Sequence, residues 1–181
     1  EVDYRDKKRV NNYKHEIAPQ ISVKPAPRNL VQFFRVIGKM AHWVAAKKGE
    51  VPDGAVVGGM DHASQLVVAR AEHDGELLPG KFVVEFKQCY VTWDGKEHNK
   101  DKYEVLCNLN VDWVSVKGGE TLPYNALPAG HTKDGEILYV GRAKYEHTKQ
   151  LGKVQPSHGK CYIPYGGKEL DFRHFEVMVL K

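Results

Sequence analysis

The sequence predicts an all-β protein in which two tandem β-rich repeats pack with pseudo-twofold symmetry around a shared core. The first observation is an internal repeat. Shifted by 72 positions, residues 66–109 of this 181-residue chain match its C-terminal segment at 13 of 44 positions. The others are a series of short segments rich in β-formers and the Gly and Pro turns that separate them. Because each repeat alone would bury little apolar surface, we expect one core between them.

The repeat divides the chain into a leader (1–42), a first repeat (43–112) and a second repeat (113–181). The leader holds nine Lys or Arg against four Asp or Glu and therefore carries a net charge of +5. Since the whole chain carries +4, the two repeats together carry −1. Its prolines favour an extended segment, and its residues 31–37 fit either a strand or a short helix. A basic leader can contact an anionic surface, although a solvated tail explains the same charges.

The expected strands follow the same order in both repeats. Each is a short, β-former-rich segment next to a turn, and together they cover residues 65–70, 81–86, 87–93, 103–106, 137–142, 160–165 and 175–180. Asp94-Gly95 and Gly166-Gly167 are hairpin turns, because Gly tolerates a positive φ. We expect a further turn at Pro79-Gly80 just before the second strand, with Gly80 and its equivalent Gly152 serving such turns.

Composition and spacing argue against several classes of function. The near-neutral repeats offer no electrostatic footprint for nucleic acid, and no apolar run is long enough to cross a membrane. Three cysteines are too few for a disulfide framework, and we expect buried thiols. No metal-ligand spacing, cofactor loop or catalytic motif stands out, so we expect neither metal, cofactor nor enzyme activity. With no visible signal peptide, the compartment stays open between cytoplasmic and secreted.

From Trp43 to the end, the order of motifs resembles that of the DM-nine repeat family. That pattern runs from a Trp-Val start through a Gly-Gly-x-Asp turn, a Val-Gly-Arg-Ala strand and a Pro-Gly-Lys turn to a Cys-Tyr-Ile-Pro-Tyr-Gly-Gly-Lys-Glu hairpin and a Tyr-Glu-Val-Leu end. The corresponding segments of this chain are Trp43-Val44, Gly58-Gly59-Met60-Asp61, Pro79-Gly80-Lys81, Tyr103-Glu104-Val105-Leu106, Trp113-Val114, Val140-Gly141-Arg142-Ala143 and residues 161–169.

The resemblance implies carbohydrate recognition. The family includes a mannose-specific oyster lectin, built from two such repeats, dimeric and active in pathogen recognition. In lectins of that kind an Asp of the Gly-Gly-x-Asp turn and a Lys of the Pro-Gly-Lys turn hold the sugar. In the first repeat these are Asp61 and Lys81. The second repeat keeps Lys153 but has Thr132 in place of the Asp, with Asp134 two positions on.

An Asp–Lys pair suits a sugar on chemical grounds. A carboxylate accepts hydrogen bonds and an ammonium donates them, so the two satisfy vicinal hydroxyls with charge-assisted bonds. From spacing alone the same residues fit solvated turn residues, and it is the family resemblance that favours the sugar site. Arg70 and Arg142 either assist a ligand or pair with Glu104 and Glu176 of their own repeats. Trp43 and Trp113 either stack on a sugar or anchor the core.

We therefore expect a lectin that binds mannose or mannose-containing glycans in pathogen recognition, with a homodimer as its expected assembly. The alternative is a non-catalytic protein-interaction or self-assembly module without a sugar site, which the missing Asp in the second repeat favours. A third reading is the targeting part of a pore-forming toxin, although the leader shows no amphipathic hairpin for insertion.

Overall fold

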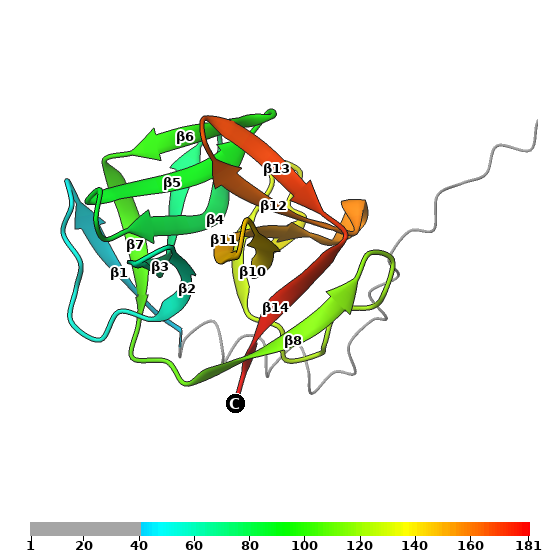
Figure 1. Ribbon diagram of the computed structural model, residues 1–181. Coiled ribbons are helices and arrows are strands. Elements are labelled where there is room, and N and C mark those ends of the chain that lie inside the picture. Colours follow the sequence, from blue (N-terminus) through cyan, green and yellow to red (C-terminus); the bar gives the residue numbers. More distant parts are fainter. Residues whose placement is uncertain (1–40) are drawn as a thin grey trace, which may run out of the picture.

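The all-β prediction is confirmed by the computed structural model, which describes residues 41–181 (Figure 1). The predictions for residues 1–40, including the segment 31–37, lie outside the described residues. Seven strands precede residue 110: β1 (His42–Lys47), β2 (Val57–Asp61), β3 (Ser64–His73), β4 (Glu76–Val83), β5 (Gln88–Trp93), β6 (Lys96–Lys100) and β7 (Lys102–Cys107). Seven follow it: β8 (Val111–Lys117), β9 (Pro128–His131), β10 (Ile137–Tyr145), β11 (Thr148–Gln155), β12 (Lys160–Tyr165), β13 (Lys168–Phe172) and β14 (His174–Leu180). A short 3₁₀ helix, Pro156–His158, joins β11 to β12.

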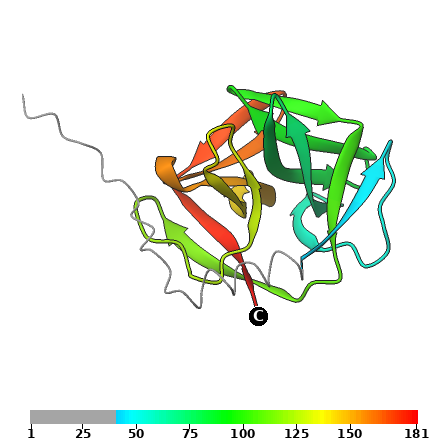
Figure 2. The ribbon, with the colours of Figure 1, turned by 180° about the vertical axis from the view of Figure 1, so that it is seen from behind.

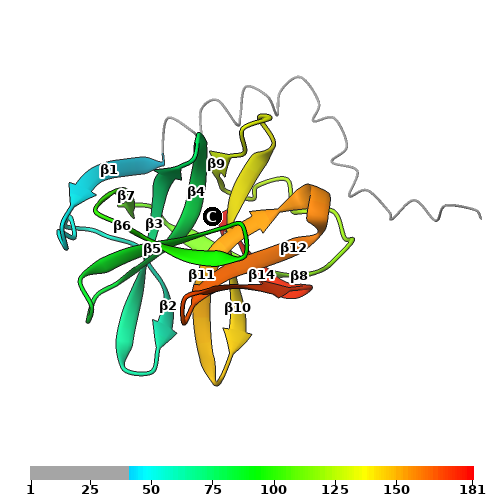
Figure 3. The same cartoon turned by 90° about the horizontal axis from the view of Figure 1, so that it is seen from above.

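The two sets of strands are related by pseudo-twofold symmetry, as predicted. Strand β2 of the first set pairs with β11 of the second, and β9 of the second pairs with β4 of the first (Figure 3). A third contact joins the β5–β6 and β12–β13 hairpins through Lys96 and Lys168, which are equivalent residues (Figure 1). Because β3 also pairs with β4, the order β3-β2-β11-β12-β13-β6-β5-β4 closes into a ring of strands. Strands β1 and β8 are the two edge strands of the sheet. In the view from behind, β1 (cyan) and β8 (yellow-green) lie on opposite sides of the molecule (Figure 2).

The shared core is also confirmed. One buried cluster contains Leu66, Val68 and Leu106 from the first half together with Val140 and Leu151 from the second. Two further clusters lie mainly within one half each. The three cysteines are free and buried, as expected. Within residues 41–181 there is no helix whose length and hydropathy would allow it to span a membrane.

The hairpin turns at 94–95 and 166–167 are confirmed. Asp94 has φ 48° and Gly95 φ 74°, while Gly166 has φ 60° and Gly167 φ 79°. Positive φ at both central residues is the signature of a type I′ turn, whose twist matches that of the flanking strands.

The turn expected at Pro79-Gly80 is wrong, because both residues lie inside β4. A Cβ built at Gly80 would lie 2.1 Å from the carbonyl oxygen of Tyr90, and one at Gly152 would lie 1.9 Å from that of Tyr162. These glycines are therefore required by the close approach of two paired strands and not by a turn.

Arg70 and Arg142 pair with the glutamates that the sequence offers. Arg70 Nε lies 2.6 Å from Glu104 Oε2, and its guanidinium lies 4.2 Å from the centre of the Trp43 ring. Arg142 repeats this arrangement with Glu176 and Trp113. Both tryptophans pack, partly buried, against the shared core, so their reading as core anchors is confirmed.

Candidate functional site

Lys81 and Lys153 occupy equivalent, buried positions in β4 and β11, on strands where the two halves meet. Lys81 is 3% exposed and Lys153 6%. Each is aligned with a tyrosine of the next strand, Tyr90 for Lys81 and Tyr162 for Lys153. A buried ammonium requires polar partners, since its removal from water is costly. The partners of the two lysines therefore define the chemistry of the two positions.

The partners of Lys81 come from the second half of the chain. Its Nζ donates a hydrogen bond to Gln150 Oε1 at 2.8 Å and lies 5.2 Å from the centre of the Tyr165 ring. Gln150 in turn donates to Thr148 Oγ1, and that hydroxyl donates to the carbonyl oxygen of Tyr145. The ammonium thus begins a buried chain of hydrogen bonds whose nearest acceptor is neutral.

Asp61 ends β2, within range for its charge to act on Lys81. Burial lowers the pKa of Lys81, and the negative charges of Glu97 and Asp61 offset part of that shift. Burial also raises the pKa of Tyr165, and the charge of Asp61 raises it further. Asp61 and Lys81, the two residues that the sequence predicts for the first site, are therefore close enough for the charge of one to act on the other, although no hydrogen bond or ion pair joins them. They face a tyrosine of the other half.

Lys153 has a different set of contacts. Its Nζ donates to the carbonyl oxygen of Thr92 at 2.9 Å and lies 3.1 Å from Glu169 Oε1. The Tyr162 ring centre is 5.4 Å away, and the Tyr162 hydroxyl is 2.7 Å from His158 Nδ1. Burial raises the pKa of Tyr162 to about 12, and the negative charge of Glu169 adds to the shift. This lysine faces a carboxylate at contact distance, whereas Lys81 faces an amide oxygen.

Thr132 and Asp134, the other sequence-predicted residues, lie in the turn between β9 and β10. The hydroxyl of Thr132 accepts a hydrogen bond from the backbone amide of Glu136 at 3.1 Å, which closes that turn. Asp134 is exposed to solvent. Their role in sugar binding remains a prediction, whereas the recorded polar contacts of Lys153 go to Thr92 and Glu169.

Three buried side-chain oxygens in residues 41–181 have no hydrogen-bond partner: Asp61 Oδ1, Thr92 Oγ1 and Glu169 Oε1. All belong to residues around the two lysines. Glu169 Oε1 lies within ion-pair distance of Lys153, but the contact lacks hydrogen-bond geometry, so this oxygen keeps unused hydrogen-bonding capacity. Leaving a buried acceptor unpaired typically costs about 1–3 kcal/mol. Such atoms mark places where a hydroxyl group can be received.

Glu97 and Glu169 tie the two halves together at these positions. The backbone amide of Gly167 donates to Glu97 Oε2 at 2.7 Å, and that of Gly95 donates to Glu169 Oε2 at 2.9 Å. Sequence reasoning missed both glutamates as candidate site residues, although the repeat aligns them. Gln150 aligns with Leu78, so its role could not be detected from the repeat.

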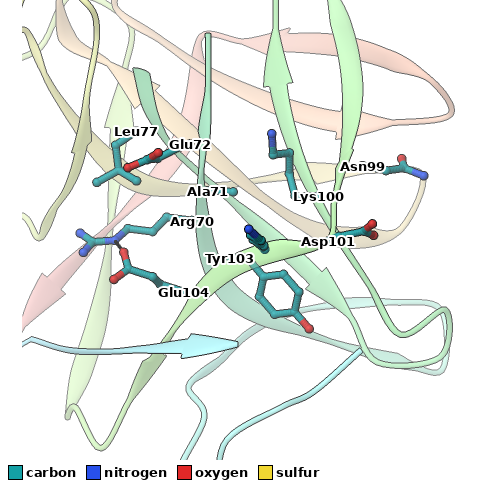
Figure 4. A pocket seen from close by; sticks show the side chains of 10 residues that line it. Arg70, Ala71, Glu72, Leu77, Asn99, Lys100, Asp101, Tyr103 and Glu104 are labelled. Carbon is teal, nitrogen blue, oxygen red and sulfur yellow. Dashed lines mark hydrogen bonds and ion pairs between the residues drawn. The ribbon is translucent and has the colours of Figure 1, made fainter. Parts of the chain in front are cut away.

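A surface pocket of about 730 Å³ lies elsewhere, between β3 and the β6–β7 turn (Figure 4). Arg70 turns its guanidinium toward Glu104 at one end, and Asn99, Lys100 and Asp101 lie at the other. A smaller pocket of about 560 Å³ includes Arg142 and Glu176 at the equivalent place in the second half. Because each arginine is already bound by its glutamate and a backbone carbonyl, these pockets offer no free guanidinium to a ligand.

Comparison with known proteins locates the chain among repeat proteins. Residues 61–172, more than half of the chain, match the sequence pattern of the DM9 repeat. This match includes Asp61, both lysines and both glutamates of the candidate sites.

One similar protein and one similar structure extend this finding. Natterin-3 of Thalassophryne nattereri is 26% identical over 139 residues, which are 74% of this chain and 34% of Natterin-3. The chain thus spans about a third of that relative's length. The crystal structure of the nematode sperm cell motility protein MFP2B superposes with a TM-score of 0.56 at 15% identity. It covers 78% of this chain and 47% of that protein, and it supports the fold alone.

Proposed function

Since the chain belongs to the DM9 repeat family, we propose that it is a lectin-like protein that binds mannose or mannose-containing glycans at Asp61 and Lys81. The observation that supports this most directly is the unpaired, buried Oδ1 of Asp61, on the carboxylate whose charge acts on the buried ammonium of Lys81. One group accepts and the other donates, so together they match two adjacent hydroxyls of a hexose.

The surroundings of the pair also suit a sugar. Lys81 donates its hydrogen bond to the neutral side chain of Gln150, so the ammonium keeps its positive charge uncompensated by that partner. Tyr165, from the other half, presents a ring 5.2 Å from the ammonium. An aromatic ring beside polar groups can cover the apolar face of a hexose. Because Asp61 and Lys81 belong to one half and Gln150 and Tyr165 to the other, both halves would be needed for the site.

The finer features of the function are part of the same proposal. A single pair of polar partners binds a monosaccharide weakly, with Kd on the order of micromolar to millimolar. A homodimer would raise the effective affinity for a glycan-coated surface by presenting several sites together. Recognition of mannose-rich microbial surfaces is the role in innate immunity that such a protein would serve. The activity proposed is binding, without catalysis.

Titration calorimetry of the whole chain with D-mannose tests the proposal, with D-galactose and D-glucose as controls. We expect saturable heat with mannose and at least a ten-fold loss of affinity in Asp61→Asn, which keeps the shape of the side chain and removes its charge. Asp53→Asn is the matched control, because Asp53 is exposed on the same half. Absence of heat with all three sugars, in a folded sample at millimolar sugar, would favour a protein-interaction module instead.

A further inference from the structure

We propose that the second half carries its own hydroxyl-binding site, built from Lys153, Glu169 and Thr92, in which Glu169 takes the part that Asp61 plays in the first. This inference rests on the proposed function, since it assigns the same class of ligand, a mannose-type sugar, to a second place. It replaces the sequence-predicted partners Thr132 and Asp134 with residues that the structure places around Lys153.

The first argument is the distribution of unpaired oxygens. Of the three found within residues 41–181, Glu169 Oε1 lies 3.1 Å from the Lys153 ammonium, and Thr92 Oγ1 belongs to the residue whose backbone carbonyl accepts a hydrogen bond from that ammonium. A carboxylate oxygen and an ammonium in contact offer the acceptor and the donor that vicinal hydroxyls satisfy, because each hydroxyl both donates and accepts. The Thr92 hydroxyl adds a further unpaired polar group on the residue that contacts Lys153.

The second argument is that Glu169 is held in place without using its free oxygen. Its Oε2 accepts a hydrogen bond from the backbone amide of Gly95 at 2.9 Å, while its backbone amide donates to the carbonyl oxygen of that glycine at 3.0 Å. The carboxylate is therefore anchored by one oxygen and presents the other toward Lys153. A carboxylate fixed in this way is preorganised for a ligand, which reduces the entropy lost on binding.

The third argument is the position of the pair just beneath the surface. The side chains of Lys153 and Glu169 keep 8% and 11% of their area exposed. Tyr162 lies beside them, half-buried, with its ring 5.4 Å from the ammonium. The Thr132 hydroxyl, in contrast, is occupied by the backbone amide of Glu136. The second half thus has a carboxylate in contact with Lys153 on its β12–β13 hairpin, in addition to the exposed Asp134 of the β9–β10 turn.

The two sites would differ in strength and selectivity. In the first, Lys81 is bound to an amide and two carboxylates lie near it. In the second, Lys153 and Glu169 already contact each other, so a sugar must insert between two groups that attract. Separating such a pair opposes binding, and we expect the second site to bind mannose more weakly than the first.

Backbone amide signals allow the sites to be followed separately by NMR. The amide of Gly95 donates to Glu169 and that of Gly167 donates to Glu97, so the two signals report on the second and first sites respectively. On titration of the ¹⁵N-labelled full chain with D-mannose, we expect both signals to shift with different midpoints. In Asp61→Asn the Gly167 response should be lost while the Gly95 response persists.

Two further variants test the second site in that background. Glu169→Gln keeps an acceptor for Gly95 but removes the charge, and should abolish the Gly95 response. Thr92→Val removes a hydroxyl that has no partner in the fold, so it should keep or raise Tm. The mannose affinity of the second site, measured from the Gly95 signal, should nevertheless fall by about 5- to 10-fold, as expected for the loss of one net hydrogen bond. Asp134→Asn is the control and should change neither signal.

The outcomes separate this inference from the proposed function. A Gly167 shift that Asp61→Asn abolishes, without any saturable shift of Gly95, would leave the first site standing and overturn the second. An Asp134→Asn variant that removes the Gly95 response would show that Asp134 in the β9–β10 turn, and not Glu169, binds the sugar. A Thr92→Val variant with higher Tm and unchanged affinity would show that Oγ1 contacts no ligand, and would overturn its role. If neither signal responds to mannose, the proposed function itself fails.

Discussion

Arg142 in the second half donates a hydrogen bond from Nη1 to the backbone carbonyl oxygen of Gly58 in the first half, at 2.9 Å. Its pseudo-equivalent, Arg70, donates in the same way to Ala129 across the interface, at 3.2 Å. Each guanidinium also lies over a tryptophan ring and is paired with a glutamate of its own half. The two arginines therefore join the halves reciprocally, which explains their repetition at a spacing of 72 residues.

Replacing Arg142 with lysine should destabilise the whole fold. A lysine keeps the charge but cannot bond the carboxylate and the carbonyl of Gly58 in the same plane, nor stack on Trp113. We expect a loss of about 1–3 kcal/mol in the free energy of unfolding, measured by urea denaturation. Lys144→Ala, at an exposed position of the same strand, should change it by less than about 0.5 kcal/mol. Equal effects of the two variants would show that the arginine does not join the halves.

The pairing of Glu176 predicts a dependence of stability on acid pH. Hydrogen bonds from Arg142 and then Lys149 lower the pKa of Glu176 from its usual 4.5, against an opposing effect of burial. A carboxyl whose folded pKa is depressed contributes stability above its unfolded pKa and loses it as pH falls through the folded value. We therefore expect wild type to exceed Glu176→Gln in free energy of unfolding at pH 7, and this difference should shrink below about pH 4.5. Urea denaturation between pH 7 and pH 3 measures it. A constant difference across this range would contradict the pairing.

The glycine at position 152 should not accept a side chain. An added Cβ would lie 1.9 Å from the carbonyl oxygen of Tyr162 and 3.1 Å from the Cα of Ile163, both backbone atoms that cannot move independently of β12. Gly152→Ala should lower the free energy of unfolding by about 3 kcal/mol or more. As the control, Gly135→Ala has open space around the Cβ and should lose only about 1–2 kcal/mol through its positive φ of 83°. Thermal unfolding of both variants checks the order.

Lys81→Met should separate binding from folding. The substitution removes a buried charge whose pKa is lowered by desolvation, but leaves Gln150 without its donor. These effects oppose each other, and we expect the free energy of unfolding to change by no more than about 1 kcal/mol. Mannose binding at the first site should nevertheless be lost, since methionine cannot donate to a hydroxyl. Lys47→Met, exposed on β1, is the matched control and should bind as wild type. Retained affinity in Lys81→Met would remove the lysine from the site.

The sequence by itself determined the repeat, the all-β class and most strands, because residue periodicity and turn glycines act locally. The hairpins at 94–95 and 166–167 follow from the ability of Gly, and of Asp94, to adopt positive φ, and the Arg–Glu pairs follow from equivalent positions in the repeats. Pro79-Gly80 was misread as a turn because the need for a glycine there comes from Tyr90, a residue on the next strand. That constraint cannot be seen along the chain.

Only the tertiary structure decided which side chains surround the lysines. Asp61 and Lys81 could be selected from the sequence, but Gln150, Tyr165 and Thr92 approach them through the exchange of strands between the halves. Glu169, which the repeat aligns with Glu97, acquires its position from the amide of Gly95, 74 residues away. Sequence patterns record the periodicity of one segment at a time. Contacts across a pseudo-twofold interface join segments whose separation leaves no local pattern, so the second candidate site emerged only from the packed structure.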